Sequence, residues 1–285
     1  MNWILLACGS AFFAGITAVL AKIGITGVNS NLATALRTVV VLLFSWLMVF
    51  ITGAQTGLQN IEPHSLTFLI LSGLATGASW LCYFKALQLG NVNRVAPVDK
   101  SSTVLTVLLA FLFLGEPITL YKGIGICGIA LGTWLMIEKK TDTEEKSKSW
   151  LVYALLSAVF ASLTSILGKV GITGIDSNLG TAIRTIVVLV MAWGIVFAQK
   201  TEYQIRDIDR KSWTYLILSG ITTGLSWLCF YAALQTGPAS VVLPIDKLSI
   251  LVTIAFSWII LKEKLSARSA IGLVILTAGT LCMLL

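Results

Sequence analysis

The chain consists of long apolar runs separated by short polar breaks. Most runs are about 20 residues long, which is the length of α-helix that crosses a bilayer. There are ten runs, which cover residues 3–25, 32–52, 65–89, 94–114, 118–138, 150–172, 179–199, 213–236, 241–261 and 267–285. The pattern predicts an all-α integral membrane protein with ten transmembrane helices.

The second half of the chain repeats the first half at a constant offset of 147 residues. The phrase "ITGVNSNLATALR" begins at Ile25, and "ITGIDSNLGTAIR" begins at Ile172. From Lys22 to Arg37, 11 of 16 positions are identical to their counterparts. The stretches "SWLCYFKALQ" and "SWLCFYAALQ" align at the same offset. Such self-similarity indicates an internal duplication.

Each copy contains five of the runs. Residues 1–138 form the first repeat, residues 139–149 form a charged linker, and residues 150–285 form the second repeat. A chain that crosses a membrane five times begins its second copy on the opposite side. The two repeats are therefore expected to be antiparallel and related by a pseudo-two-fold axis in the membrane plane, as in many secondary transporters.

Basic residues in the loops gather on one side of the predicted membrane. Of the thirteen in loops or at helix ends, only Lys122 lies on the other side. The remaining twelve are Arg94, Lys139, Lys140, Lys146, Lys148, Lys200, Arg206, Arg210, Lys211, Lys262, Lys264 and Arg268. The positive-inside rule then places the linker in the cytoplasm and both termini outside.

Composition excludes several classes of function. Hydrophobic residues make up 56% of the chain and charged residues 12%, so lipid is the expected solvent for most of it. The net charge of +7 is explained by the loops, and we expect no nucleic-acid partner. The five cysteines lie in apolar runs without a CxxC pair, which favours structural thiols. With His64 alone in a loop and no nucleophile–base pair, we expect neither an enzyme nor a metal or cofactor.

Seven basic residues lie within or at the margins of the predicted helices, where an unpaired charge is costly. They are Lys22, Arg37, Lys85, Lys100, Lys169, Arg184 and Lys247. Only Asp99 and Asp246 offset them at comparable depth. The charges of the first repeat lie toward one side of the membrane, and their copies lie toward the other. Alternating access needs two such gates.

We hypothesise that Arg37 and Asp99 help to close one mouth, and that Arg184 and Asp246 help to close the other. The predicted gating or coupling set is Lys22, Arg37, Lys85, Asp99, Lys169, Arg184 and Asp246. The alternatives are lysines and arginines that snorkel to the headgroups and Asp–Lys pairs that are purely structural.

The two "SWLC" stretches carry aromatic side chains, some with polar tips, which suit a pocket for an organic molecule. Trp80 and Phe84 share a helix face at i, i+4 spacing, as do Trp227 and Tyr231. An interfacial belt or simple helix packing is the alternative. The predicted substrate-binding set is Trp80, Tyr83, Phe84, Lys100, Trp227, Phe230, Tyr231 and Lys247.

Two further features concern packing and helix ends. Glycines recur in the fifth and tenth runs, including the small-residue motif from Gly128 to Gly132, and these helices are expected to form a seam between the repeats. Glu116 and Glu263 lie at helix ends, where we expect them to be exposed or capping.

The segments "PVDKSSTVLTVLLAFLFLGE" and "PIDKLSILVTIAFSWIILKE" resemble the EamA domain of the drug/metabolite transporter superfamily. The resemblance covers essentially the whole chain. The phrase "ITGxxSNLxTAxR" is similar to that of a bacterial and archaeal branch whose simpler members carry a single five-helix unit. The resemblance implies a cell (inner) membrane location and a central cavity lined by helices 1, 3, 4, 6, 8 and 9. It also implies export of amino acids, other metabolites, drugs or nucleotide sugars.

Two departures qualify the resemblance. Related small multidrug resistance proteins exchange protons for cations through a glutamate in the first helix. Here the first run contains Thr17 and Lys22 instead, which argues against that exchange. The resemblance also implies cytoplasmic termini, and we follow the loop charges, which place them outside.

Together these features predict a secondary transporter, an exporter, that moves a small organic metabolite by alternating access. The excess of basic residues favours a carboxylate or phosphate on the substrate, as in an amino acid. The alternatives are an exporter of drugs or lipid-linked molecules, and a membrane scaffold or sensor. The expected partners are a small-molecule substrate, the lipid bilayer and a proton as the candidate coupling ion. The expected assembly is a monomer or a homodimer.

The orientation can be tested with a single cysteine placed in residues 139–149 of a chain whose native cysteines have been replaced. We expect this cysteine to resist membrane-impermeant thiol reagents in intact cells and to react after permeabilisation. Ready labelling in intact cells would reverse the topology.

Overall fold

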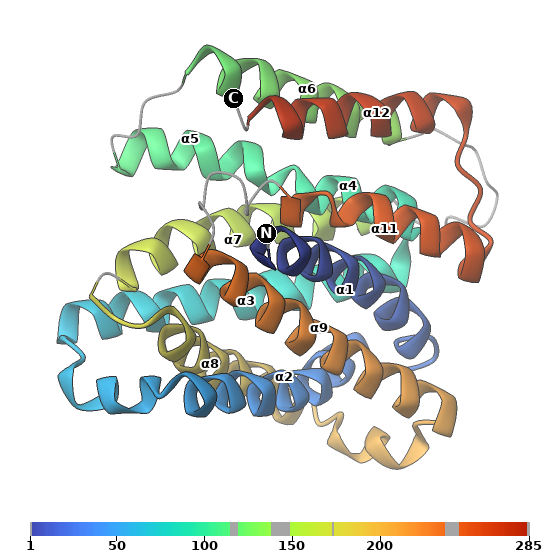
Figure 1. Cartoon of the computed structure of the whole chain (residues 1–285). Coiled ribbons are helices and arrows are strands. Elements are labelled where there is room, and N and C mark those ends of the chain that lie inside the picture. Colours follow the sequence, from blue (N-terminus) through green and yellow to red (C-terminus); the bar gives the residue numbers. More distant parts are fainter. Residues whose placement is uncertain (1, 115–118, 138–148, 173, 237–244, 284–285) are drawn as a thin grey trace.

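The computed structural model describes residues 2–114, 119–137, 149–172, 174–236 and 245–283, and every regular element within these ranges is helical (Figure 1). The first repeat contains α1 (Asn2–Gly24), α2 (Ser30–Thr52), η1 (Ala54–Asn60), α3 (Pro63–Leu89), α4 (Val92–Lys100), α5 (Ser102–Leu114) and α6 (Leu120–Met136). The second repeat contains α7 (Ser149–Gly171), α8 (Ser177–Ala198), η2 (Glu202–Asp207), α9 (Arg210–Thr236), α11 (Ser249–Phe256), η3 (Ser257–Leu261) and α12 (Ala267–Cys282).

The two repeats are interleaved. Helix α1 packs against α9 and α11 of the second repeat, and its counterpart α7 packs against α3, α4 and α5 of the first (Figure 1). Helix α2 packs against its own counterpart α8. Such reciprocal contacts are those of a two-fold relation between copies. Because each repeat has five membrane-crossing segments, the repeats are inverted across the membrane.

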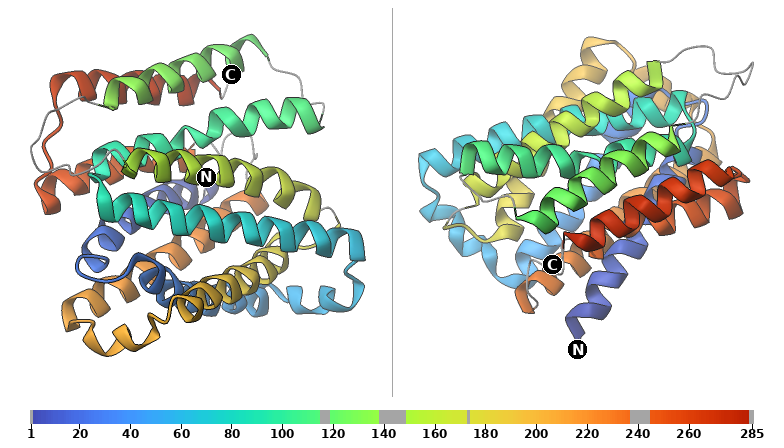
Figure 2. Two further views of the ribbon diagram at one scale, coloured as in Figure 1. Left: turned by 180° about the vertical axis from the view of Figure 1, so that it is seen from behind. Right: turned by 90° about the horizontal axis from the view of Figure 1, so that it is seen from above.

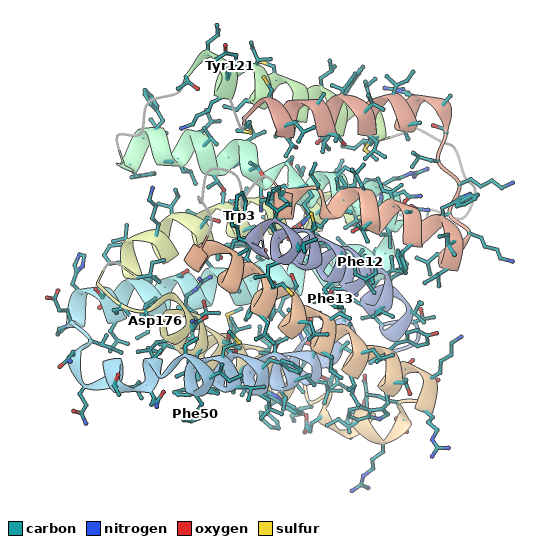
Figure 3. All side chains as sticks on the ribbon, in the orientation of Figure 1. Trp3, Phe12, Phe13, Phe50, Tyr121 and Asp176 are labelled. Carbon is teal, nitrogen blue, oxygen red and sulfur yellow. The ribbon has the colours of Figure 1, made fainter. Side chains whose placement is uncertain are left out.

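The outer surface is suited to lipid. Seven helical segments of the described chain are long and apolar enough to cross a bilayer, and α6 and α12 are shorter apolar helices. Large apolar side chains project outward, including Phe50, which is 61% exposed, and Tyr121, which is 48% exposed (Figure 3). A protein in water rarely exposes continuous apolar surface of this extent. The chain is a multi-pass membrane protein.

Helices α6 and α12 form a layer of their own, side by side in both views of Figure 2. Their glycines bring the two backbones into close contact. A Cβ atom at Gly132 would lie 2.6 Å from the carbonyl oxygen of Gly272, and one at Gly125 would lie 2.7 Å from that of Gly279. Small residues allow this approach between helices in lipid. The expected seam therefore joins the fifth helix of each repeat.

The repeated "ITGxxSN" phrase starts a helix in both copies. The side chain of Asn29 accepts the N–H of the second residue of α2 at 2.9 Å, and that of Asp176 accepts the N–H of the second residue of α8 at 2.8 Å. Two residues before each cap, Gly27 and Gly174 adopt φ angles of 77° and 78°, which favour glycine. The phrase is thus a turn and an N-cap, each of which satisfies backbone groups at a helix start.

The run predicted as one helix over residues 94–114 is divided into α4 and α5 at Ser101. There the N–H of Val104 bonds to the carbonyl of Ser101 at 2.9 Å, which is an i→i−3 contact within the α-helical pattern. The second repeat has the same contact, from Leu251 to Leu248, also at 2.9 Å. The break therefore occurs at equivalent positions of both repeats.

The seam can be tested by adding one methyl group. Gly132→Ala is expected to lower the thermal midpoint in detergent, because overpacking costs about 1–3 kcal/mol when backbone cannot yield. Gly123→Ala on the same helix is the matched control, since no atom lies within 4 Å of its Cβ position. Equal midpoints for both variants would contradict the close seam.

Candidate functional site

The charged residues of the two "PxDK" segments meet at the helix breaks. Asp99 and Lys100 end α4, and Asp246 and Lys247 directly precede the equivalent break at Leu248. Lys247 interacts electrostatically with Lys100, Asp99 and Asp246. All four side chains are half-buried. They form one cluster to which each repeat contributes a carboxylate and an ammonium group, and we call it the Asp–Lys cluster.

Each carboxylate of the cluster is held by a serine of the opposite repeat. Ser157 Oγ on α7 donates to Asp99 Oδ1 at 3.0 Å, and Ser10 Oγ on α1 donates to Asp246 Oδ1 at 2.8 Å. Ser10 and Ser157 occupy equivalent positions and are fully buried. Hydrogen bonds to an ionised acceptor are among the stronger ones in proteins. The exchange of first helices between repeats thus also anchors both aspartates.

A second pair of serines extends these contacts. Ser79 Oγ lies 3.3 Å from Ser157 Oγ and donates to the Ser157 carbonyl at 3.1 Å. Ser226 Oγ lies 3.2 Å from Ser10 Oγ and donates to the Ser10 carbonyl at 3.1 Å. The sequence analysis did not select these four serines. Their signal was the recurrence of serine at the same two positions of both repeats, within otherwise apolar helices.

The ammonium groups of the Asp–Lys cluster are held less tightly than the carboxylates. Within the described ranges, neither Lys100 nor Lys247 has a hydrogen-bond or ion-pair partner for its ammonium group. A charged group in a membrane interior is costly unless it is paired or reaches water. The hydrogen-bond donors of both ammonium groups are therefore unused within the described residues, next to two carboxylates whose hydrogen bonds are made.

Aromatic side chains of the two "SWLC" stretches also join the repeats. The rings of Trp80 on α3 and Trp227 on α9 are 6.1 Å apart between centroids and tilted by 38°. These two residues are equivalent, so their pair also joins the repeats. Tyr83 interacts electrostatically with both Asp99 and Arg37. The structure thus brings together Trp80 and Trp227 as one pair and Lys100 and Lys247 as another, and Tyr83 interacts with Asp99 of the Asp–Lys cluster.

Arg37 is almost fully buried, at 3% exposure, among groups of the second repeat. Its Nε donates to Ser219 Oγ at 2.6 Å and its Nη2 donates to Thr223 Oγ1 at 3.2 Å. The guanidinium carbon also lies 4.1 Å from the ring centroid of Phe84. No ion pair joins Arg37 to Asp99 in the part of the chain that the structure describes. Their joint role as a gate stays a prediction.

Arg184 makes the equivalent contact in the other direction. Its Nη2 donates to Thr76 Oγ1 on α3 at 3.0 Å, and Thr76 is the counterpart of Thr223. Arg37 therefore joins α2 to α9 of the second repeat, and Arg184 joins α8 to α3 of the first repeat. Like that of Arg37, the gating role of Arg184 stays a prediction.

The three remaining predicted lysines lie away from the Asp–Lys cluster. Lys22 donates to the carbonyl oxygens of Leu87 and, at 2.5 Å, Gly90, at the end of α3. Lys85 donates to Gln88 Oε1 at 2.9 Å on the same helix. Lys169 is exposed.

Of the predicted aromatic residues in the second repeat, Phe230 packs with Trp3, Ala7 and Ile245 near the start of α1. The side chain of Tyr231 lies outside the described residues. Residues 139–149 lie outside them too, except for Ser149 at the start of α7.

A small cleft lies beside Trp227, between α2, α8 and α9. It is lined by Phe44, Ser45, Met48, Asn178, Thr181, Gly224 and Trp227. Its free space is about that of one water molecule. Asn178 Oδ1 is buried there and has no hydrogen-bond partner among the described residues. Because Asn178 begins α8, the cleft lies toward the membrane face opposite the linker.

Across the described residues, no three His, Cys, Asp or Glu side chains gather in a way that could hold a metal ion. The chemistry available at the centre is ion pairing, hydrogen bonding and contact with aromatic rings.

Comparison with known proteins yields one family. The model of the EamA-like transporter family matches residues 1–138 and again residues 148–285. A relative from Sinorhizobium sp, "Uncharacterized transporter in cobO 3'region", is 47% identical over 135 residues, which are 47% of this chain and 96% of the relative. That relative therefore corresponds in length to a single repeat.

Two further matches are more distant. "Uncharacterized transporter YxxF" of Bacillus subtilis (strain 168) is 27% identical over 174 residues, which span 58% of this chain and about half, 54%, of the relative. A solved structure, titled "Crystal structure of protein", is 18% identical with a TM-score of 0.66 and covers 98% of this chain and 94% of its own. At this identity the likeness concerns the fold alone.

The burial of Arg37 predicts a large effect of a conservative change. Arg37→Lys is expected to reduce the free energy of unfolding by about 1–3 kcal/mol, because a lysine cannot reproduce the guanidinium's hydrogen bonds and ring contact together. Arg268→Lys is the control, since Arg268 is exposed and lies over the Trp134 ring at 4.9 Å. Thermal unfolding in detergent measures both. Equal losses would show that the interior contacts of Arg37 contribute little.

Proposed function

The chain belongs to the EamA-like transporter family, and we propose that it is a secondary transporter that exports a small organic solute bearing a carboxylate or phosphate group, such as an amino acid. Transport occurs by alternating access in a bacterial or archaeal cell membrane, with the linker in the cytoplasm. Membrane transport itself follows from the family and from the relatives named as transporters.

The observation that carries the anionic substrate is the unequal binding of charges in the Asp–Lys cluster. Both carboxylates accept a serine hydroxyl, whereas neither ammonium has a partner within the described residues. A substrate carboxylate or phosphate would form charge-assisted hydrogen bonds to Lys100 or Lys247. A substrate amine would be attracted to Asp99 or Asp246. An amino acid satisfies both requirements.

The symmetry of the cluster supports alternating access. Each repeat supplies one aspartate and one lysine to it, so the same kinds of groups are available to both sides of the membrane. Discontinuous helices near a pseudo-two-fold axis are the usual site of substrate binding in inverted-repeat transporters. Arg37 and Arg184 lie on opposite sides of this centre, where we propose that they take part in opening and closing the pathway.

We further propose a proton as the coupling ion, since each repeat contributes one carboxylate that can take it up. Both halves of the pathway are in one chain. A single protomer is therefore sufficient for transport, whether the protein is a monomer or a homodimer.

The alternative substrate is a drug or a lipid-linked molecule. The cleft beside Trp227 is lined by apolar Phe44, Met48 and Trp227, but it would have to widen from about the size of one water molecule to admit such a substrate. In that case the lysines would bind a headgroup phosphate.

The proposal predicts the effect of removing the cations. In proteoliposomes, Lys100→Gln and Lys247→Gln are each expected to weaken competition by amino acids or organic anions by roughly tenfold or more, because a charge-assisted hydrogen bond is lost. Counterflow of a labelled amino acid measures this effect. Arg268→Gln, an equal charge change on the exposed face of α12, is the control.

Two results would count against the anionic substrate. The first is that amino acids and organic anions neither bind nor move while lipophilic cations do. The second is that both lysine variants transport as well as the control.

A further inference from the structure

The corner between α3 and α4 lies on the linker side of the membrane and is held by two side chains from outside it. Lys22 of α1 donates to the carbonyls of Leu87 and Gly90, at the end of α3. The C-terminal carbonyls of a helix carry partial negative charge, so an ammonium group is stabilising there. The first of the two ties thus fixes the end of α3.

The second tie comes from the other repeat. Glu263, which follows η3, accepts the backbone N–H of Val92 at 3.3 Å through Oε1 and that of Asn93 at 3.2 Å through Oε2. Asn93 Nδ2 also donates to the Glu263 carbonyl at 3.3 Å. Buried Ser257 donates its hydroxyl to Oε2 at 2.6 Å and so orients the carboxylate. The sequence placed Glu263 at a helix end, and the helix it caps is α4 of the opposite repeat.

In each of the two ties, the charge of the side chain is opposite to the partial charge of the helix end that it binds. Lys22 neutralises the C-terminus of α3, Glu263 neutralises the N-terminus of α4, and the two side chains attract each other electrostatically. The contacts of Glu263 join the second repeat to α4 of the first repeat, and α4 ends in Asp99 and Lys100. On the linker side, α4 therefore cannot part from the loop after η3 while Glu263 is bound.

We propose that Glu263 is the latch that closes the linker-side mouth, and that opening this mouth requires its carboxylate to release the α4 N-terminus. The proposal rests on the proposed alternating access. Glu263 is half-buried, so water can replace its contacts when it moves. The cleft beside Trp227 lies toward the opposite face. The rival interpretation is a static helix cap.

The latch can be tested without any substrate. Spin labels on Leu89→Cys and Lys264→Cys, both at exposed positions, report the separation of the α3–α4 corner from the loop after η3. The labels are placed in a chain without native cysteines, and double electron–electron resonance gives the distance distribution in proteoliposomes.

In this assay Glu263→Gln and Glu263→Ala are expected to move population from the short to the long distance. The short-to-long ratio should fall by roughly tenfold, as expected for the loss of a carboxylate bound to a helix N-terminus. Ser257→Ala removes one oriented hydrogen bond and should shift the ratio less, in the same direction. Glu62→Gln is the matched control, because Glu62 precedes α3 at its N-cap and makes no side-chain capping bond.

Thermal unfolding separates the latch from the static cap. A lower midpoint with an unchanged distance distribution would establish a static cap and overturn the proposal, as would an unchanged distribution at an unchanged midpoint. Should the Glu263 variants fail to fold, Ser257→Ala decides by the same criterion. A shifted distribution in a protein that transports no anionic solute would retain the latch and reject the proposed substrate.

Discussion

The structure depends on one constraint, which is that polar groups inside a bilayer must find partners within the protein. Here the partners lie in the opposite repeat. Asp99 is held by Ser157, and Arg37 by Ser219 and Thr223, while the reciprocal contacts hold Asp246 and Arg184. Neither repeat could satisfy these groups alone. This exchange of contacts between the repeats, through the first helices for the aspartates and the third helices for the arginines, is therefore a requirement of the buried charges as well as a mode of packing.

The same exchange places the binding groups. The Asp–Lys cluster lies where the fourth and ninth crossing segments are interrupted, and it contains equal contributions from both copies. Interrupted helices tolerate charges because their free backbone groups and any entering water stabilise them. The charges of the Asp–Lys cluster thus lie at the interruptions. Lys22, at the end of α1, instead binds the end of another helix.

Much of this fold could be predicted from the sequence, because a constant offset of 147 residues and an odd number of crossings leave little freedom. The interruption at Ser101 was not predicted, because residues 94–114 together have the length of one crossing helix, although residues 99–103 are all polar. In the site, the residue types and the equivalence of Asp99 and Asp246 in the two repeats were evident, but the sequence analysis assigned the two to opposite mouths, whereas both interact with Lys247 in the Asp–Lys cluster. The partners of the two aspartates were not evident, because the contacts of Ser10 and Ser157 depend on which helices interleave. Glu263 was assigned to a helix end, but the helix that it caps could not be predicted, because α4 belongs to the opposite repeat.

The glycine seam between α6 and α12 has a consequence for how the two copies can diverge. A side chain added at Gly132 would meet the backbone of Gly272, and one added at Gly272 would meet the backbone of Gly132. An added side chain at either glycine would thus clash with backbone atoms of the other helix. A side-chain substitution at the opposite position does not remove those backbone atoms. Phe44 and Met191, which are counterparts beside Gly224 and Gly77, have already become different. The two crossings of the seam, Gly125 with Gly279 and Gly132 with Gly272, therefore exclude a side chain in either copy, whereas positions 44 and 191 have room to differ.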